Sequence, residues 1–188
     1  KILLFGEDIT CLPEHRRTAL GIGRTFQITN VFHNLTVLEN VFLAIQGNSR
    51  QKWIMHRTVK TFSKSLIRAR EELGRVGLTK RSQDAVHHLS YGEQRQLEIA
   101  LALASEPRVL FLDEPCSGLS PGERQRIADI INEFPQDITV VLIEHDMNIA
   151  LGLADQVAVL HRGRIIIEGT LDEVRANPEV REVYLGKV

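Results

Sequence analysis

Two acidic residues directly follow an apolar run in Val109-Leu110-Phe111-Leu112-Asp113-Glu114. Four consecutive apolar residues predict a buried strand, and that strand would end by placing both carboxylates in a polar site. At such a position Asp113 is suited to hold Mg²⁺ through water, and Glu114 is suited to accept a proton from an attacking water. The run therefore predicts a hydrolytic site at the carboxyl edge of a parallel sheet.

A second candidate site opens the helix predicted over residues 90–104. Ser90 is a typical N-cap, and Glu93 stands three residues later, as a capping box requires. The free N–H groups of a helix start, the Ser90 hydroxyl and the small Gly92 favour a phosphate site. A well-capped helix without a ligand is the alternative for this motif alone, because capping boxes are common.

The elements that must position these residues follow from hydrophobic periodicity and turn residues. Gly6-Glu7-Asp8 predicts a turn, and Thr10 a cap region before the next helix. The basic helix at 52–76 indicates a solvated face, with proximity to a bilayer as the alternative. Strands are expected at 2–5, 21–27, 109–112, 139–143, 156–160 and 164–167, the last two around the turn His161-Arg162-Gly163. Helices are expected at 14–20, within 30–46 after a capping box of Thr36 and Glu39, and at 52–76, 90–104, 121–134, 169–174 and 177–184.

Composition limits the class of protein. The 188 residues suffice for one ordinary domain, and 43% of them are hydrophobic. The net charge of −1 gives no argument for a nucleic-acid partner. Cys11 and Cys116 form no recognisable disulfide framework, which favours a reduced, cytoplasmic compartment. No apolar stretch approaches the roughly 20 residues of a membrane span, so a membrane role is expected to come through a partner.

Three runs in this order resemble the nucleotide-binding domain of ABC transporters: the helix start LSYGEQRQLEIALALA, the strand ending in Asp113-Glu114-Pro115, and Ile143-Glu144-His145-Asp146. The ending from Asn177 to Gly186 is similar to subunits of branched-chain amino-acid importers. The resemblance implies a partial P-loop NTPase (ABC ATPase) α/β fold, with a mainly parallel sheet flanked by helices and a helical subdomain. It implies one domain over 1–188, with 28–105 as helical subdomain and signature helix, and 1–27 and 106–188 as parts of the RecA-like core.

The resemblance also assigns roles to residues that the sequence alone leaves open. Gln27 would contact Mg²⁺ and the attacking water, and His145 would contact the γ-phosphate. Without the resemblance, Gln27 is a common solvated loop residue, and His145 is a structural residue, a metal ligand or a general base. The signature motif that binds nucleotide in trans would comprise Ser90, Tyr91, Gly92, Glu93 and Gln94, and the D-loop Ser117, Gly118 and Leu119. Cys116 is interpreted as a small interfacial residue, because no Cys-His pair is evident.

The cofactors and partners expected from the resemblance are those of an ATP-driven importer. ATP and Mg²⁺ would be bound in the intact protein. A second ABC ATPase subunit, identical or different, and transmembrane permease subunits would be direct partners. A periplasmic or extracellular solute-binding protein would be an indirect partner, and nucleic acid is not expected. The location implied is cytoplasmic, peripheral on the inner face of the cell membrane.

A P-loop, G-x-x-x-x-G-K-[ST], is absent from the sequence, whose only Gly-Lys pair is Gly186-Lys187. Its main-chain N–H groups and Lys would cradle the phosphates. Lys1 to Phe5 begins directly in a strand pattern without an initiator Met, and we interpret the chain as a fragment of a longer protein. We expect it to be inactive alone, because its catalytic side chains have no nucleotide held beside them.

Two alternatives from other classes remain at this stage. The first is a non-catalytic ABC partner module that supplies only the signature motif in trans to a complete subunit. The second is an ABC ATPase of DNA repair or translation. The lack of a coiled-coil insertion between Gln27 and Ser90, together with the near-neutral charge, counts against the second.

Overall fold

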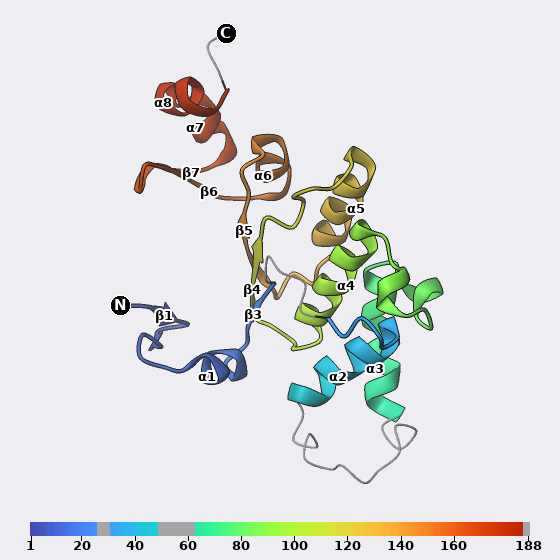
Figure 1. The fold of residues 1–188 in the computed structure, drawn as a ribbon. Helices are drawn as coiled ribbons and strands as arrows, with labels where there is room; N and C mark the ends of the chain where they lie inside the picture. The colour runs from blue at the N-terminus through green and yellow to red at the C-terminus, as the bar shows by residue number, and fades with distance from the viewer. Residues whose placement is uncertain (26–30, 49–62, 186–188) are drawn as a thin grey trace. The chain divides into compact units, whose positions relative to one another are not determined.

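The computed structural model describes residues 1–25, 31–48 and 63–185 (Figure 1). The chain divides into two compact units, Lys1–Val141 and Leu142–Val188, which are described separately below. No helix of the described residues is long and apolar enough to cross a membrane. The expected division into a helical subdomain at 28–105 and a core formed by the rest stays a prediction.

The first unit is built on strand β4 (Val109–Asp113), the middle strand of a sheet ordered β3-β4-β5. β3 (Ile22–Arg24) pairs with it in parallel, with Ile22 opposite Val109 and Arg24 opposite Phe111. β5 (Thr139–Ile143) forms the other neighbour. The apolar run of β4 thus lies where the sequence predicts it, and Leu110 and Leu112 are fully buried.

Three helices lie against one another between β3 and β4 in the chain (Figure 1). They are α2 (Val37–Asn48), α3 (Ser63–Arg75) and α4 (Tyr91–Leu103). Thr36 and Glu39 form the predicted capping box of α2, with Glu39 Oε2 accepting from Thr36 N at 2.7 Å. Two 3₁₀ turns, Thr79–Arg81 and Val86–His88, lead into α4. The helix predicted at 52–76 is confirmed for α3, and its first part, 52–62, lies outside the described residues.

Helix α5 (Pro121–Asn132) follows β4 and carries three buried isoleucines, Ile127, Ile130 and Ile131. Proline is tolerated at its first position because that N–H has no helical partner. The predicted helix extended two residues further, to Phe134. In the structure the helix has its C-cap at Glu133.

Two predictions at the amino terminus are wrong. Glu7–Asp8 is not a turn but strand β2, paired antiparallel with β1 (Leu3–Leu4) across a turn at Phe5-Gly6. Positive φ at both turn residues, 48° and 87°, matches the twist of a two-residue hairpin. Helix α1 (Glu14–Ala19) has Pro13 as N-cap, not Thr10. The Thr10 hydroxyl donates to Asp8 Oδ1 at 2.6 Å and accepts from Ile2 N, so it closes the hairpin.

The second unit packs helices on a hairpin. β6 (Val157–His161) and β7 (Arg164–Gly169) pair antiparallel around the predicted turn, although His161 itself belongs to β6. A bulge lies at Val159/Leu160. Gly163 has φ +78°, which glycine adopts readily. The helical elements are α6 (Met147–Leu153), α7 (Leu171–Ala176), α8 (Pro178–Val180) and a π-helical turn, Arg181–Leu185. Their core comprises Leu151, Val159, Val174 and Val180.

Glu72 is a buried carboxylate on α3 whose effect on stability is testable. Burial raises its pKa above the ordinary 4.5, although Arg75 and Arg68 oppose the shift. We expect Glu72→Gln to raise the free energy of unfolding at pH 7.5 by about 1 kcal/mol, because the charge is desolvated while its partner Arg75 is half exposed. Denaturant unfolding of the variant and the wild type measures this difference.

The pH dependence of that difference has a defined sign. Because the pKa of Glu72 is raised in the folded state, this group contributes to the stability of the wild type in full below pH 4.5. That contribution to stability is lost as the pH rises through the folded-state pKa. The advantage of Glu72→Gln should therefore shrink as the pH falls toward 4.5. Glu71→Gln, an exposed neighbour on the same helix, is the control. A Glu72→Gln advantage that grew at low pH would contradict the assignment.

Candidate functional site

Asp113 and Glu114 form the catalytic edge, the name used here for the carboxyl end of β4. The burial of Leu110 and Leu112 fixes the strand that delivers them. Asp113 Oδ2 lies 3.2 Å from Arg24 Nη2 on the neighbouring strand β3, and Asp113 N donates to Thr25 Oγ1 at 3.4 Å. A guanidinium thus already balances part of the Asp113 charge. No local sequence pattern indicated Arg24, because its contact with Asp113 depends on the pairing of β3 with β4.

Glu114 has a backbone φ of 48°, in the left-handed region that non-glycine residues rarely adopt. Its carbonyl accepts from Ser117 N at 3.1 Å, which closes the turn after the strand. Such conformations cost about 1–2 kcal/mol for an L-residue and cluster at functional sites. The extended backbone of β4 thus ends at Asp113, and Glu114 belongs to the turn that follows.

The signature end is the amino terminus of α4, residues 89–94. Its capping box forms as predicted: Ser90 Oγ accepts from Glu93 N at 3.2 Å, and Glu93 Oε2 accepts from Ser90 N at 2.8 Å. Arg81 Nε lies 3.1 Å from the other Glu93 oxygen, while Arg81 Nη1 lies 2.7 Å from Asp84. Arg81 therefore ties Glu93 to the segment before the helix. The sequence analysis did not identify Arg81.

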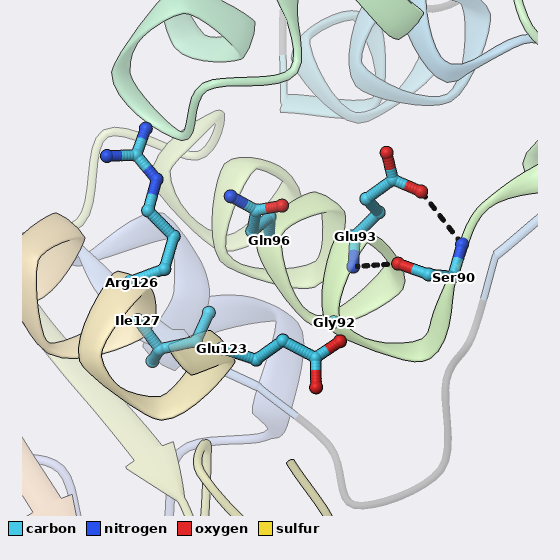
Figure 2. Close-up of a pocket in the computed structure, with 7 residues that line it drawn as sticks. All are labelled: Ser90, Gly92, Glu93, Gln96, Glu123, Arg126 and Ile127. Carbon is cyan, nitrogen blue, oxygen red and sulfur yellow. Dashed lines mark hydrogen bonds between the residues drawn. The ribbon is translucent and has the colours of Figure 1, made fainter. Parts of the chain in front are cut away.

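A small pocket of about 80 Å³ lies between the first turns of α4 and α5 (Figure 2). Glu123 of α5 points its carboxylate at Gly92, where a Cβ on Gly92 would stand 2.5 Å from Glu123 Oε1. Ser120 donates to the other oxygen, Oε2, through its hydroxyl at 2.6 Å and its N–H at 2.9 Å. These Ser120 bonds lower the pKa of Glu123, and the Gly92 N–H adds a smaller lowering. The Ser-x-x-Glu spacing was the sequence signal for this residue.

The predicted D-loop packs beside the signature end. Ser117 N bonds the Glu114 carbonyl, Leu119 is buried, and the Leu119 carbonyl accepts from Arg124 Nε at 2.9 Å. Gly118 has φ +74°, and a Cβ there would lie 3.3 Å from Tyr91 Cε1. Signature residue Tyr91 and loop residue Gly118 are therefore neighbours in the structure, although 27 positions separate them. Cys116 is buried, in keeping with a packing role.

Tyr91 leads into a buried ion pair that sequence reasoning missed. Arg95 Nη2 donates to the Tyr91 hydroxyl at 2.8 Å, and Arg95 Nη1 lies 2.7 Å from Glu98 Oε2. Burial acts to lower the pKa of Arg95, but the bonds and charges of Glu98 and Tyr91 outweigh it and raise that pKa. The sequence signal for these contacts was the i,i+3 and i,i+4 spacing of the residues on α4. Exposed pairs on helices have the same spacing, so it does not reveal that this pair is buried.

The remaining predicted site residues are Gln27, His145 and Gln94. Gln27 lies outside the described residues. His145 follows β5 in the unit Leu142–Val188, where its neighbour Asp146 caps α6 by accepting from Asn148 N at 2.9 Å. Gln94 donates from its side chain to the Leu89 carbonyl at 3.2 Å and so stabilises the signature end. Within the described part of the chain, no group of three or more His, Cys, Asp or Glu is placed to hold a metal ion.

Comparison with known proteins decides the family. The sequence pattern of the family described as "ABC transporter" matches residues 1–117. The chain belongs to the ABC transporter family of ATP-binding proteins. Residues 164–188 match a second pattern, "Branched-chain amino acid ATP-binding cassette transporter", at the ending that the sequence analysis singled out.

Sequence relatives support this assignment to the ABC family over nearly the whole chain. The "High-affinity branched-chain amino acid transport ATP-binding protein LivG" of Escherichia coli K12 is 35% identical over 99% of this chain and 76% of its own length. The "High-affinity branched-chain amino acid transport ATP-binding protein BraF" of Pseudomonas aeruginosa has the same identity and coverage. A probable LivG of Archaeoglobus fulgidus is 31% identical over 99% of this chain and 74% of its own.

Solved structures confirm the ABC ATPase fold. The ATP-binding cassette MJ1267 is similar with a TM-score of 0.77 and 27% identity, covering 95% of this chain and 74% of that one. A dimeric post-hydrolysis state of the cassette MJ0796, bound to ADP and Pi, gives a TM-score of 0.73 and 26% identity, covering 89% and 72%. The predicted fold class, an ABC-type ATPase fold with a parallel sheet and flanking helices, is thereby confirmed.

The Ser90 cap generates a stability prediction for this ABC domain. Ser90→Ala removes the acceptor for Glu93 N, and we expect a loss of about 1 kcal/mol in the free energy of unfolding. Ser90→Thr keeps a hydroxyl acceptor, so its free energy of unfolding should fall by only about a few tenths of a kcal/mol. Urea denaturation followed by circular dichroism compares the three chains. Equal stability of the wild type and Ser90→Ala would show that the hydroxyl does not cap α4.

Proposed function

We propose that the chain carries the hydrolytic residues of the ATP-binding subunit of an ABC importer for branched-chain amino acids, coupling ATP hydrolysis to solute uptake. The observation that carries the proposal is Glu114, placed directly after a buried strand with its backbone in the left-handed region. The solute class rests on LivG and BraF, whose names state branched-chain amino acid transport, and on the matching pattern at 164–188.

In this proposal the catalytic edge acts on the attacking water. Glu114 accepts its proton as general base, and Gln27 and His145 contact the water and the γ-phosphate, respectively. Asp113, a hard oxygen donor at the strand end, suits Mg²⁺, which Gln27 would also contact. Bound Mg²⁺ would neutralise phosphate charge. Arg24, 3.2 Å from Asp113, holds this carboxylate in position in the structure.

The signature end acts on a nucleotide held by another subunit. Its first-turn N–H groups and the Ser90 hydroxyl would meet the γ-phosphate, and the D-loop of Ser117, Gly118 and Leu119 would belong to the same pairing surface. A second ABC ATPase subunit and membrane permease subunits are the direct partners. A solute-binding protein outside the membrane is the indirect one. The chain would then sit on the inner face of the cell membrane, at the cytoplasmic side.

A second function is favoured by a specific observation. The signature end has a complete capping box, with Ser90 as N-cap and Gly92 in the first turn of α4. These features suit a partner module that supplies only the signature motif in trans. The two functions differ in one respect: whether residues 1–188 ever hydrolyse ATP when a P-loop is joined to them.

The first test is titration of the chain with a fluorescent ATP analogue and Mg²⁺, beside a P-loop-extended chain. The extended chain carries a family P-loop segment at its amino terminus. We expect binding and hydrolysis only by the extended chain, because the phosphates otherwise lack their cradle. Binding by residues 1–188 alone would contradict this placement of the nucleotide site. An extended chain that binds without hydrolysing would favour the partner-module function.

The second test addresses Glu114 in the P-loop-extended chain. Glu114→Gln keeps the shape of the side chain but removes the base, so kcat should fall by about 10²- to 10⁴-fold while ATP binding is retained. Glu133→Gln, an exposed residue at the end of α5, is the matched control and should leave kcat unchanged. Steady-state phosphate release measures both variants. A Glu114→Gln variant with wild-type kcat would remove Glu114 from the reaction.

A further inference from the structure

A carboxylate of the chain itself lies at the signature end. Glu123 Oε1 stands where a Cβ of Gly92 would be only 2.5 Å away, so the absence of a side chain at Gly92 permits the approach (Figure 2). The Gly92 N–H contributes a bond to this carboxylate. The first-turn N–H groups of a helix attract anions. Glu123 therefore places a negative charge of the chain itself at the amino terminus of α4, where the proposed function puts a phosphate.

Ser120 holds this anion in place from the other side. Glu123 Oε2 accepts from the Ser120 hydroxyl at 2.6 Å and from the Ser120 N–H at 2.9 Å, which leaves Oε1 toward Gly92. Because two hydrogen bonds hold the Glu123 side chain at the start of its own helix, moving it away costs free energy. An incoming phosphate would meet a fixed negative charge rather than a mobile one.

The charge of Glu123 is stabilised by hydrogen bonds rather than by a recorded ion pair. Among the described residues, no Lys or Arg nitrogen is recorded within 4 Å of its carboxylate. Arg126 lines the same pocket, but Figure 2 shows its guanidinium directed away from Glu123. The other acid at this end, Glu93, differs because Arg81 lies 3.1 Å from its Oε1. Glu123 is thus the acid whose field acts on a ligand at Gly92.

We propose that Glu123 competes with the γ-phosphate of a trans-bound nucleotide for the signature end and so weakens ATP-dependent pairing of this chain with a P-loop-bearing subunit. The proposal rests on the trans-acting role given to the signature end under the proposed function. It adds a residue outside the signature motif that sets the strength of engagement. Glu123 is partly open to solvent, and two like charges about 4 Å apart in the dielectric of water repel by an amount that corresponds to about a fivefold change in affinity.

The chain offers matched controls for the effect of capping alone. Glu39 and Glu173 form the same box with Thr36 and Thr170 on other helices. Glu173 also lies against a glycine, because a Cβ on Gly169 would meet its Oε2. Glu39→Gln and Glu173→Gln therefore remove the same charge from the same local structure at the starts of other helices.

The experiment measures pairing of the 188-residue chain with a labelled probe. The probe is the P-loop-extended chain with Glu114→Gln, which prevents hydrolysis, and Ser90→Arg, which blocks its own signature end. Only the signature end of the unextended chain can then complete a site on the probe. Fluorescence anisotropy with MgATP gives the apparent Kd for the wild type, Glu123→Gln, Glu39→Gln and Glu173→Gln, and urea unfolding checks the stability of each.

The expected result is an apparent Kd about fivefold lower for Glu123→Gln than for the wild type, with both control variants unchanged. Raising the salt concentration should shrink the difference, because ions screen the repulsion, whereas a packing effect would persist. If the wild type pairs normally and Glu123→Gln has an equal or higher apparent Kd, the proposal for Glu123 is overturned while the trans-acting role stands. No pairing by any variant overturns both this proposal and the trans-acting role.

Discussion

The burial of β4 is the constraint on which the site depends. Leu110 and Leu112 are fully enclosed, so the strand has one register and one direction, and its last residue must emerge at the carboxyl edge. Asp113 is thereby brought within 3.2 Å of Arg24 from the adjacent parallel strand. The turn that follows places Glu114 at φ 48° and supplies the carbonyl that accepts from Ser117 N. The strand core, the acidic pair and the start of the D-loop are one connected unit.

Carboxylates at helix starts are a repeated device of this chain. Glu39, Glu93, Glu123 and Glu173 each return to the residue three positions before them, and the pKa of Glu39, Glu123 and Glu173 is lowered chiefly by those bonds. In α2 and α7 these bonds only cap the start of a helix. At the signature end two such acids meet, one on α4 and one on α5. Stability and function therefore compete there, because a carboxylate that caps a helix also repels phosphate.

The buried pair Arg95–Glu98 gives α4 a polar anchor beneath the signature end. Arg95 reaches Tyr91, whose ring lies against Gly118 of the D-loop. Within the described residues neither Arg95 Nε nor Glu98 Oε1 has a hydrogen-bond partner, so the pair is incompletely satisfied. Buried polar groups of this kind are retained at a cost in stability. Its position connects the signature end and the D-loop, the two parts assigned above to the pairing surface of the ABC family.

Local sequence determined the elements that have strong patterns. The apolar run before Asp113, the Ser90/Glu93 box, the box at Thr36/Glu39 and the hairpin at Arg162-Gly163 were all predictable, because each is specified by residues within a few positions of one another. The same local reasoning failed at Glu7–Asp8 and Thr10, where the hydroxyl bonds back across a hairpin instead of capping the next helix. Only the tertiary structure decided the contacts of Arg24 with Asp113, Tyr91 with Gly118 and Glu123 with Gly92. These pairs are distant in the chain, and their distances depend on how strands pair and helices pack, which no local pattern encodes.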